Sequence, residues 1–197
     1  MYIPRHFAVT DRLEIVSFLE ANAFGQLIST VDGKPFCSHL PFLVSGDGSR
    51  LIAHVARQNP QHNEIGGQLV LATFAGPHDY VSPSWYSAPG VPTWNYQAVH
   101  VYGQCSTFSD PVRLGELVET LADRYESGFA RPWQASYESR MLEAIVGIDI
   151  AVTEIQCKYK LGQNRPEQDQ RQVAAKLREA GSTLLADAMD RSRSLRG

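Results

Sequence analysis

Apolar and polar residues alternate with a period of two along much of the first 110 residues, which is typical of half-buried strands. The expected strands cover residues 25–31, 36–44, 51–56, 69–74 and 98–108. Asp32-Gly33 predicts a tight hairpin turn between the first two. Alternation returns at residues 148–161. Short strands bounded by turns, with few helices, indicate a mainly β chain that folds as a closed or nearly closed barrel.

Helical patterns stand between and after these strands. Asp11 followed by Glu14 predicts a capping box for a helix to about Ala21. Asn59-Pro60 favours a short helical turn, and Asp110-Pro111 opens a helix to about residue 126. Further helices are expected at residues 137–144, 167–180 and 182–191. We therefore expect a barrel domain at residues 1–165 and a C-terminal helical extension at residues 166–197.

The stretch from residue 76 to residue 97 concentrates prolines and aromatic residues. Its prolines, at positions 77, 83, 89 and 92, exclude a helix and predict a stiffened loop. Tyr80, Trp85, Tyr86, Trp94 and Tyr96 alternate with short polar residues. Such a loop suits a planar ligand with polar edges. A lid that packs its own aromatic side chains over the core explains the pattern equally well.

Composition narrows the class of protein. The chain has 197 residues, 43% of them hydrophobic, a formal net charge of −3 and a pI of about 6.1. This balance disfavours a dedicated DNA-binding module. Arg191, Arg193 and Arg196 come closest to a basic patch, and we expect them in a solvated tail. Three cysteines without a CxxC, no signal-peptide pattern and no membrane-length apolar run predict a cytoplasmic protein that contacts no membrane.

Two places on or after predicted strands suit ligand chemistry. His39 lies among apolar residues, where a core histidine is the common explanation. His54 precedes Arg57, Gln58 and Asn59, where a strand enters a helical turn, which is a suitable cradle for a phosphate. A capped turn with a solvated arginine is the alternative.

Two more candidates lie on later strands. His100 lies on the strand that leaves the aromatic loop. Lys158 and Lys160 share one strand face before a glycine turn, and the amides of Gln163 and Asn164 follow. Amides both donate and accept hydrogen bonds, so they suit the edge of a heterocycle. Exposed strand-end charge is the alternative. The histidine and cysteine spacings predict no metal site, and no motif supports a catalytic residue.

Taken together, these motifs resemble the PaiB-like proteins, the FMN-binding negative transcriptional regulator family. The resemblance covers nearly the whole chain. The matching segments are residues 2–7, His39-Leu40-Pro41-Phe42, His54-Val55-Ala56 with Asn59-Pro60, residues 80–86, residues 91–96, Val99-His100, residues 145–147, and Lys158-Tyr159-Lys160-Leu161 with Gln163-Asn164-Arg165. The resemblance implies an FMN-binding split barrel with peripheral helices and a homodimer that holds flavin at the subunit interface.

The resemblance also implies roles for the candidate residues. Arg57, Gln58 and Asn59 would approach the FMN phosphate. The isoalloxazine ring would be flanked by Trp85, Trp94, Asn95 and Tyr96. Contacts to the phosphate or ring edge, from the same or the partner subunit, would come from Lys160, Gln163 and Asn164. The pocket lining would include His39, His54 and His100. The chain departs from the family at Gly162, where serine is usual, and in a shorter segment between Tyr86 and Val91 that lacks lysine.

The expected function is a flavin-dependent or ligand-dependent regulator that acts as a cytoplasmic homodimer and responds to a small molecule. Direct DNA binding stays open, because no basic helix-turn-helix is evident. One alternative is a flavin-dependent oxidoreductase acting on a small substrate, since flavin supplies its own chemistry. A flavin-free interaction scaffold is the other alternative.

Overall fold

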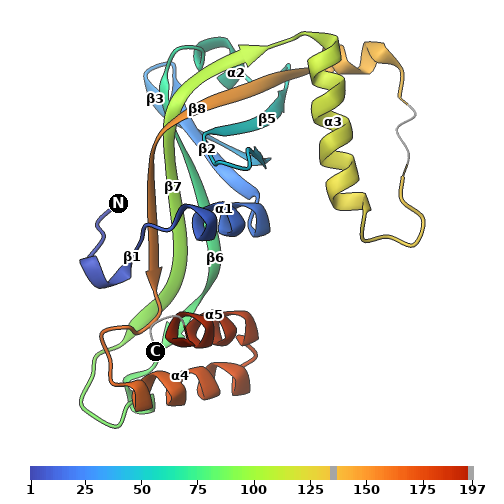
Figure 1. The fold of residues 1–197 in the computed structure, drawn as a ribbon. Coiled ribbons are helices and arrows are strands. Elements are labelled where there is room, and N and C mark those ends of the chain that lie inside the picture. The colour runs from blue at the N-terminus through green and yellow to red at the C-terminus, as the bar shows by residue number, and fades with distance from the viewer. Residues whose placement is uncertain (134–136, 195–197) are drawn as a thin grey trace. The chain divides into compact units, whose positions relative to one another are not determined.

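The computed structural model describes residues 1–133 and 137–194, and in this part of the chain eight strands form one sheet (Figure 1). Their order is β3-β2-β6-β7-β8-β5-β4, with β1 paired to β8. The strands are β1 (Ala8–Val9), β2 (Phe24–Val31), β3 (Lys34–Pro41), β4 (Leu43–Val44), β5 (Arg50–Ala56), β6 (Leu69–Val81), β7 (Thr93–Phe108) and β8 (Ile145–Lys160). The pairings of β2 with β3 and β6, of β5 with β4 and β8, and of β1 with β8 are antiparallel.

The helices largely follow the predicted ones. They are α1 (Arg12–Ala21), α2 (Gln61–Glu64), α3 (Pro111–Glu126), α4 (Glu167–Glu179) and α5 (Thr183–Ser194), with 3-10 helices η1 (Arg5–Phe7), η2 (Pro83–Trp85) and η3 (Ser139–Ala144). The predicted capping of α1 is confirmed, because the Glu14 amide donates to Asp11 Oδ1 at 2.9 Å. Within the described ranges, no helix combines the length and apolar composition needed to cross a bilayer.

The chain forms two compact units. The terminal unit consists of Met1–Ile15, Ala75–Val99 and Gln156–Gly197, and the sheet unit consists of Val16–Phe74 and His100–Ile155. Strands β6, β7 and β8 each begin in one unit and end in the other. Helices α4 and α5 belong to the terminal unit, together with the first residues of the chain. The domain boundary expected at residue 165 stays a prediction.

The sheet unit is built on alternation. In β2, Leu27 and Val31 are buried while Phe24 and Gln26 on the other side are exposed. The hairpin turn has positive φ at both Asp32 (49°) and Gly33 (70°), which matches the type I′ turn that this dipeptide favours. Strand β3 contacts β5 as well as β2, so the sheet curls toward closure.

The single strand expected over residues 36–44 is wrong, because the chain bends at Phe42. This residue lies between β3 and β4, is fully buried, and meets Phe74 edge-on with ring centroids 5.3 Å apart. Its amide donates to Ala23 O at 2.9 Å rather than to a neighbouring strand. Burying this large ring moves the next residues, Leu43–Val44, from the β2 side to pair with β5.

The aromatic loop is shorter than expected, because β6 continues to Val81 and β7 begins at Thr93. The predicted strand before the loop ended at residue 74. The pairing of β6 with β2 covers Leu71–Thr73, so Pro77 lies beyond it. A proline there removes no hydrogen bond from that ladder. Residues 82–92 therefore form the loop, and η2 supplies a single 3-10 turn within it.

Two smaller expectations also fail. The helix expected over residues 137–144 is the 3-10 helix η3, which begins at Ser139. The expected solvated tail is wrong for Arg193, which lies half-buried in α5, whereas Arg191, also in α5, is exposed as expected. Arg193 is only 22% exposed and pairs with Asp190 at 2.8 Å. Arg196 lies outside the described residues.

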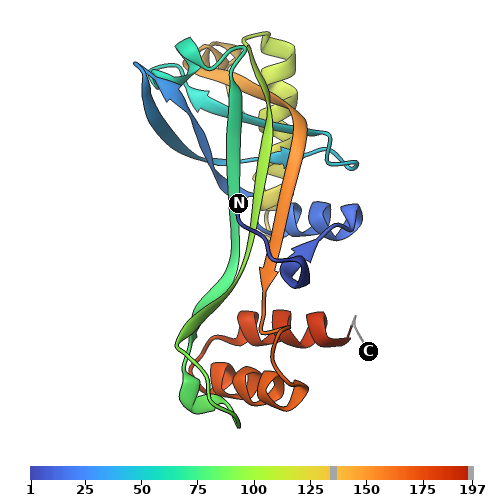
Figure 2. The same cartoon turned by 90° about the vertical axis from the view of Figure 1, so that its left-hand side faces the viewer.

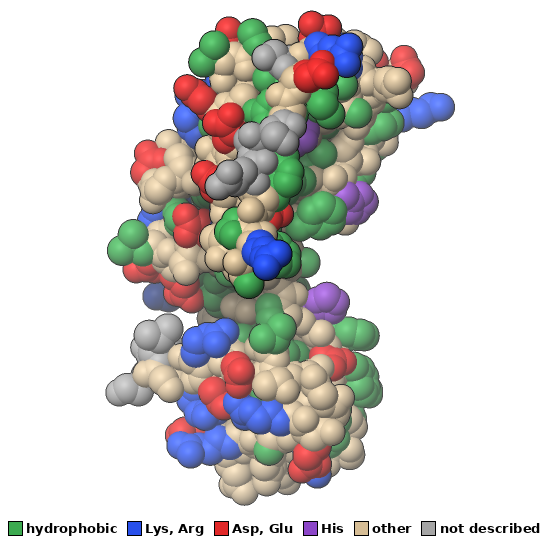
Figure 3. Space-filling view, turned by 90° about the vertical axis from the view of Figure 1, so that its right-hand side faces the viewer, with side chains coloured by type: hydrophobic (Ala, Val, Ile, Leu, Met, Phe, Trp, Pro, Cys, Tyr) green, Lys and Arg blue, Asp and Glu red, His purple; other side chains and the backbone are tan. Residues whose placement is uncertain are grey.

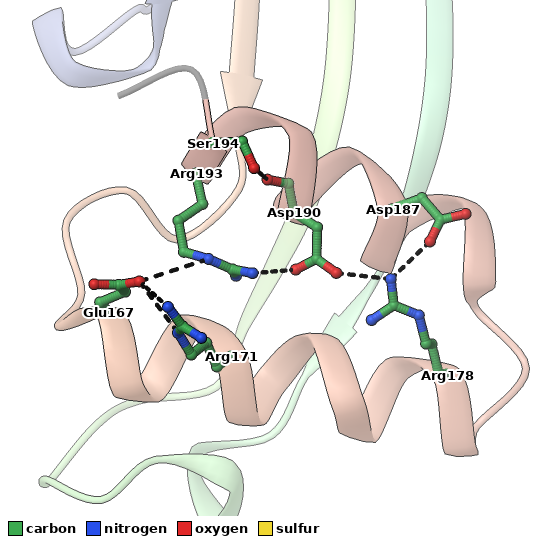
Figure 4. Close-up of polar contacts among 7 residues, drawn as sticks. All are labelled: Glu167, Arg171, Arg178, Asp187, Asp190, Arg193 and Ser194. Atoms are coloured by element: carbon green, nitrogen blue, oxygen red, sulfur yellow. Dashed lines mark hydrogen bonds and ion pairs between the residues drawn. The ribbon is translucent and has the colours of Figure 1, made fainter. Parts of the chain in front are cut away.

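Helices α4 and α5 form an antiparallel pair held by apolar packing and ion pairs (Figure 4). Arg178, near the end of α4, lies 2.7 Å from both Asp187 and Asp190 of α5. Glu167, at the start of α4, lies 2.5 Å from Arg171 and 3.9 Å from Arg193. Each surface pair contributes at most about 1 kcal/mol, so the buried seam carries most of the stability. That seam includes Val173, Ala174, Leu177, Leu185, Ala186 and Met189.

The turn after β8 favours glycine at position 162. Gly162 has φ of +83°, and a Cβ there would have ordinary contacts, the nearest being Asn95 Nδ2 at 3.7 Å. We predict that Gly162→Ala or Gly162→Ser lowers the free energy of unfolding by about 1–2 kcal/mol through backbone strain alone. Gly46→Ala is the matched control, since Gly46 has an ordinary φ and no neighbour within 4 Å. Equal melting temperatures for the two alanine variants would refute this account.

Candidate functional site

Three cations gather at the end of β8 in the terminal unit. Lys160 Nζ donates to Thr93 Oγ1 at 2.6 Å and to Trp94 O at 2.5 Å. Burial lowers the pKa of the Lys160 ammonium below its usual value, and the charges of Lys158 and Arg165 lower it further. Like charges held this close repel one another. The cluster therefore gains stability from any anion that binds beside it.

Aromatic rings lie against two of these cations, Lys158 and Arg165. Lys158 is only 8% exposed, and its Nζ lies 5.3 Å from the centre of the Tyr96 ring, within the range of a cation–π contact. The Arg165 guanidinium stacks 4.2 Å above the Tyr86 ring. Trp94 is 53% exposed and belongs to a cluster with His78 and Tyr80. Exposed and half-buried aromatic rings beside buried and half-buried cations suit a planar ligand that carries an anionic group.

The other candidates of the terminal unit are placed less favourably for a ligand. Asn95 is 3% exposed, and its Nδ2 donates to Met189 Sδ at 3.4 Å, so it faces α5. Gln163 closes the turn after β8, accepting from Leu161 N at 2.7 Å and donating to Tyr159 O at 2.6 Å. Asn164 is exposed and Trp85 is half-buried. The structure thus brings Lys160 and Trp94 together. Asn95 instead packs against α5, and Gln163 closes the turn after β8.

Arg57 and Asn59 in the sheet unit hold their own loop in place. The Arg57 guanidinium donates to Glu143 O and, at 3.1 Å, to Ile145 O, which fastens the start of β8. Asn59, just before α2, accepts from Gln61 N at 3.0 Å and donates to Ser38 Oγ at 2.8 Å. Gln58 is exposed. Their role at a phosphate stays a prediction, and the geometry adds a structural role for the first two.

Two half-buried histidines of the sheet unit carry buried ring nitrogens without a partner. The Nδ1 atoms of His54, on β5, and His100, on β7, have no hydrogen-bond partner among the described residues. Burial lowers the pKa of both imidazoles, so both favour the neutral form. Unpartnered buried nitrogens are costly, and a ligand that hydrogen-bonds to them would remove that cost. His39 differs, because it is exposed on the outer side of β3.

The sequence analysis singled out neither Arg165 nor Asp149. Arg165 ends a quoted motif, but nothing in the sequence showed that it would stack on Tyr86. Asp149 is 2% exposed and accepts hydrogen bonds from both Arg50 and Arg113, linking β8 to β5 and α3. A charged residue between Ile148 and Ile150 in a strand is a signal for such a buried ion pair.

A family model described as "Putative FMN-binding domain" matches residues 1–154. The chain belongs to this FMN-binding family. FMN is the cofactor of the family, which confirms the predicted cofactor. The chain is 41% identical over 186 residues to the Bacillus subtilis protein "Protease synthase and sporulation protein PAI 2", covering 90% of this chain and 89% of that protein.

Solved structures agree on the fold. The flavocytochrome Anf3 from Azotobacter vinelandii superposes with a TM-score of 0.67 at 19% identity, over 85% of this chain and 77% of the other. The FAD- and heme-binding protein from Mycobacterium smegmatis gives a TM-score of 0.61 at 18% identity, over 77% of this chain and 72% of the other. The expected flavin-binding split-barrel fold of the FMN-binding family is therefore confirmed. The cations and rings of the terminal unit fit a cofactor with a phosphate and a planar ring.

Protonation of His54 should couple stability to pH. Its pKa is lowered in the folded state, so below about pH 6.5 the unfolded chain binds the proton first, and stability falls as pH falls. We predict that His54→Gln flattens the rise in unfolding free energy between about pH 5 and pH 7. The exposed His6 provides the control, His6→Gln. Urea titrations at each pH measure the effect, and an unchanged slope in His54→Gln would contradict it.

Proposed function

We propose that this chain is an FMN-binding regulator that acts as a homodimer in the cytoplasm and responds to flavin state or to a small molecule. Family membership supports the cofactor, and the name of the Bacillus subtilis relative, which contains the words "Protease synthase and sporulation protein", supports a regulatory role. The observation that carries the proposal is the cluster of Lys158, Lys160 and Arg165 among exposed and half-buried aromatic rings.

Each part of the cluster has a distinct part to play in binding. Lys160 and Arg165 would hold the phosphate, since charged hydrogen bonds to phosphate are among the strongest in proteins. Trp94 and Tyr96 would contact the isoalloxazine ring of FMN. Burial of Lys158 against Tyr96 keeps a positive charge near that ring without exposing it. When bound, FMN supplies a redox state whose change alters the charge of the ring, which is a suitable signal for a regulator.

Indirect regulation, through a partner or a small molecule, fits the surface charge better than direct DNA binding. Non-specific DNA affinity depends on cations free to pair with phosphates. In α4 and α5, Arg178 and Arg193 are engaged with Asp187, Asp190 and Glu167. Figure 3 shows basic and acidic side chains interspersed on the lower part of that view, over these helices. We therefore propose that the chain affects transcription through a partner and does not bind DNA itself.

Replacing Lys160 tests the cofactor proposal. Lys160→Met should weaken FMN binding about ten- to hundredfold, because a charged hydrogen bond to phosphate is lost. Titration of apoprotein with FMN, followed by flavin fluorescence, measures the effect. Lys176→Met is the matched control, because Lys176 lies on the surface of α4 and pairs only locally with Glu179. Trp94→Phe, which leaves the cation cluster intact, should change the flavin spectrum. Equal FMN affinity in both lysine variants would refute the assigned site.

A DNA titration tests indirect regulation. We expect the FMN-loaded protein to show no affinity for duplex DNA that depends on salt between about 50 and 200 mM. Fluorescence anisotropy with labelled DNA, including the promoter of the chain's own gene, gives the measurement. Binding that weakens steeply with salt would show direct contact with DNA phosphates and would overturn this part of the proposal.

A further inference from the structure

The aromatic loop, residues 82–92, is fastened to the start of α4. The backbone amide of Ser87 donates to Asp169 Oδ1 at 2.8 Å, and the Ser87 hydroxyl donates to Gln172 Oε1 at 3.1 Å. Asp169 and Gln172 lie about one turn apart on α4. Figure 2 shows the loop, drawn in green, beside α4 at the bottom of the view. The loop is thus held by a helix that lies outside residues 1–154, the range of the family model.

Asp169 is buried at a cost in free energy. It is only 1% exposed, although a carboxylate in the first turn of α4 would favour the helix dipole equally well from the surface. Its Oδ2 atom is buried and has no hydrogen-bond partner among the described residues, which is unfavourable. The other oxygen, Oδ1, accepts from the loop amide of Ser87. Burial of Asp169 therefore serves the attachment of the loop rather than the helix itself.

The same loop contacts the guanidinium of Arg165. This group stacks on the Tyr86 ring, and its Nη1 donates to Pro89 O at 3.4 Å. A Cβ at Gly90 would lie 2.4 Å from Tyr86 Cδ2 and 3.0 Å from Arg165 Nη2, both shorter than an ordinary van der Waals contact. Gly90 has no positive φ, so the position calls for glycine because of space and not because of backbone conformation. The stack of Arg165 on Tyr86 therefore depends on the missing side chain of Gly90.

Arg165 needs this support because no opposite charge holds it. Among the described residues it contacts Tyr86 and Pro89, and no carboxylate pairs with it. Its charge helps to lower the pKa of Lys160, so the two cations lie close enough to repel one another. A long cationic side chain without a partner turns toward water, where its charge is solvated. The contacts with the loop oppose this movement and keep the guanidinium near Lys160.

We propose that Gly90 and Asp169 are positioning residues of the FMN site, which hold the aromatic loop so that Tyr86 keeps the Arg165 guanidinium in place for the phosphate. This inference rests on the proposed function and adds what orients one of its cations. Asp169 fixes the loop to α4, and Gly90 leaves room for the stack. Neither residue contacts FMN. Their effect is to favour a flavin that carries a phosphate over a neutral flavin.

The preference of the apoprotein for FMN over riboflavin, which lacks the phosphate, tests the inference. We expect Gly90→Ala and Asp169→Ala each to lower this preference about three- to tenfold, by weakening the binding of FMN and not of riboflavin. Asp169→Asn keeps an acceptor oxygen for Ser87 and should retain the preference. The controls are Gly46→Ala, at a position with open space, and Glu167→Ala, which removes a charge from the same turn of α4.

Two further measurements separate positioning from general destabilisation. In an Arg165→Met background, Gly90→Ala should lower the preference no further, because the guanidinium that it misplaces is already absent. Hydrogen exchange of the apoprotein should become faster in residues 82–92 of Gly90→Ala and Asp169→Ala, and stay unchanged in both controls. Circular dichroism confirms that each variant is folded.

An unchanged preference in Gly90→Ala and Asp169→Ala, while Lys160→Met still weakens FMN binding, would overturn the inference and leave the proposed site standing. Unchanged hydrogen exchange of the loop would overturn it without any flavin present, and so would an additive loss in the Arg165→Met background. Equal affinity of the unaltered protein for FMN and riboflavin would overturn the proposed phosphate site and this inference together.

Discussion

Three strands, β6, β7 and β8, carry residues of both compact units, and this continuity constrains everything else in the fold. In the sheet unit their residues alternate between a buried side and an outer side. In the terminal unit the same strands present Trp94, Lys158 and Lys160. The buried carboxylate of Asp149 anchors one of these strands, since Arg50 and Arg113 both donate to it from neighbouring elements. Strand β8 is thereby fastened at one end by an ion pair, and at the other end it places its two lysines.

The cation cluster at the end of β8 is better suited to binding an anionic ligand than to stabilising the fold. A fold gains little from holding Lys158, Lys160 and Arg165 together, because burial and mutual repulsion both lower the pKa of Lys160. The turn that follows is built for this placement, with Gly162 at a positive φ and Gln163 closing the backbone. An anion beside the cluster turns an electrostatic cost into a gain, and the proposed function assigns the FMN phosphate as that anion.

Much of the fold could be predicted from the sequence, because local chemistry decides it. The Asp32-Gly33 hairpin, the Asp11 cap and the Asp110-Pro111 helix start all occur where the pattern placed them. The break at Phe42 could not be predicted, since it depends on a distant partner, Phe74. The site was harder for the same reason. The sequence pattern placed Lys158 and Lys160 on one face of a strand, and so singled out Lys160. Only tertiary packing shows that Asn95 faces Met189 and that Arg57 donates to backbone carbonyls.

The central claim is that the terminal-unit cations recognise the phosphate of FMN. The most direct measurement compares the affinities of the apoprotein for FMN and for riboflavin, which lacks the phosphate, by equilibrium dialysis at low and high salt. The account predicts that FMN binds more than about tenfold tighter than riboflavin at low salt. The difference should shrink as salt screens the cluster. Equal affinity for the two flavins at low salt, or binding of neither, would contradict it.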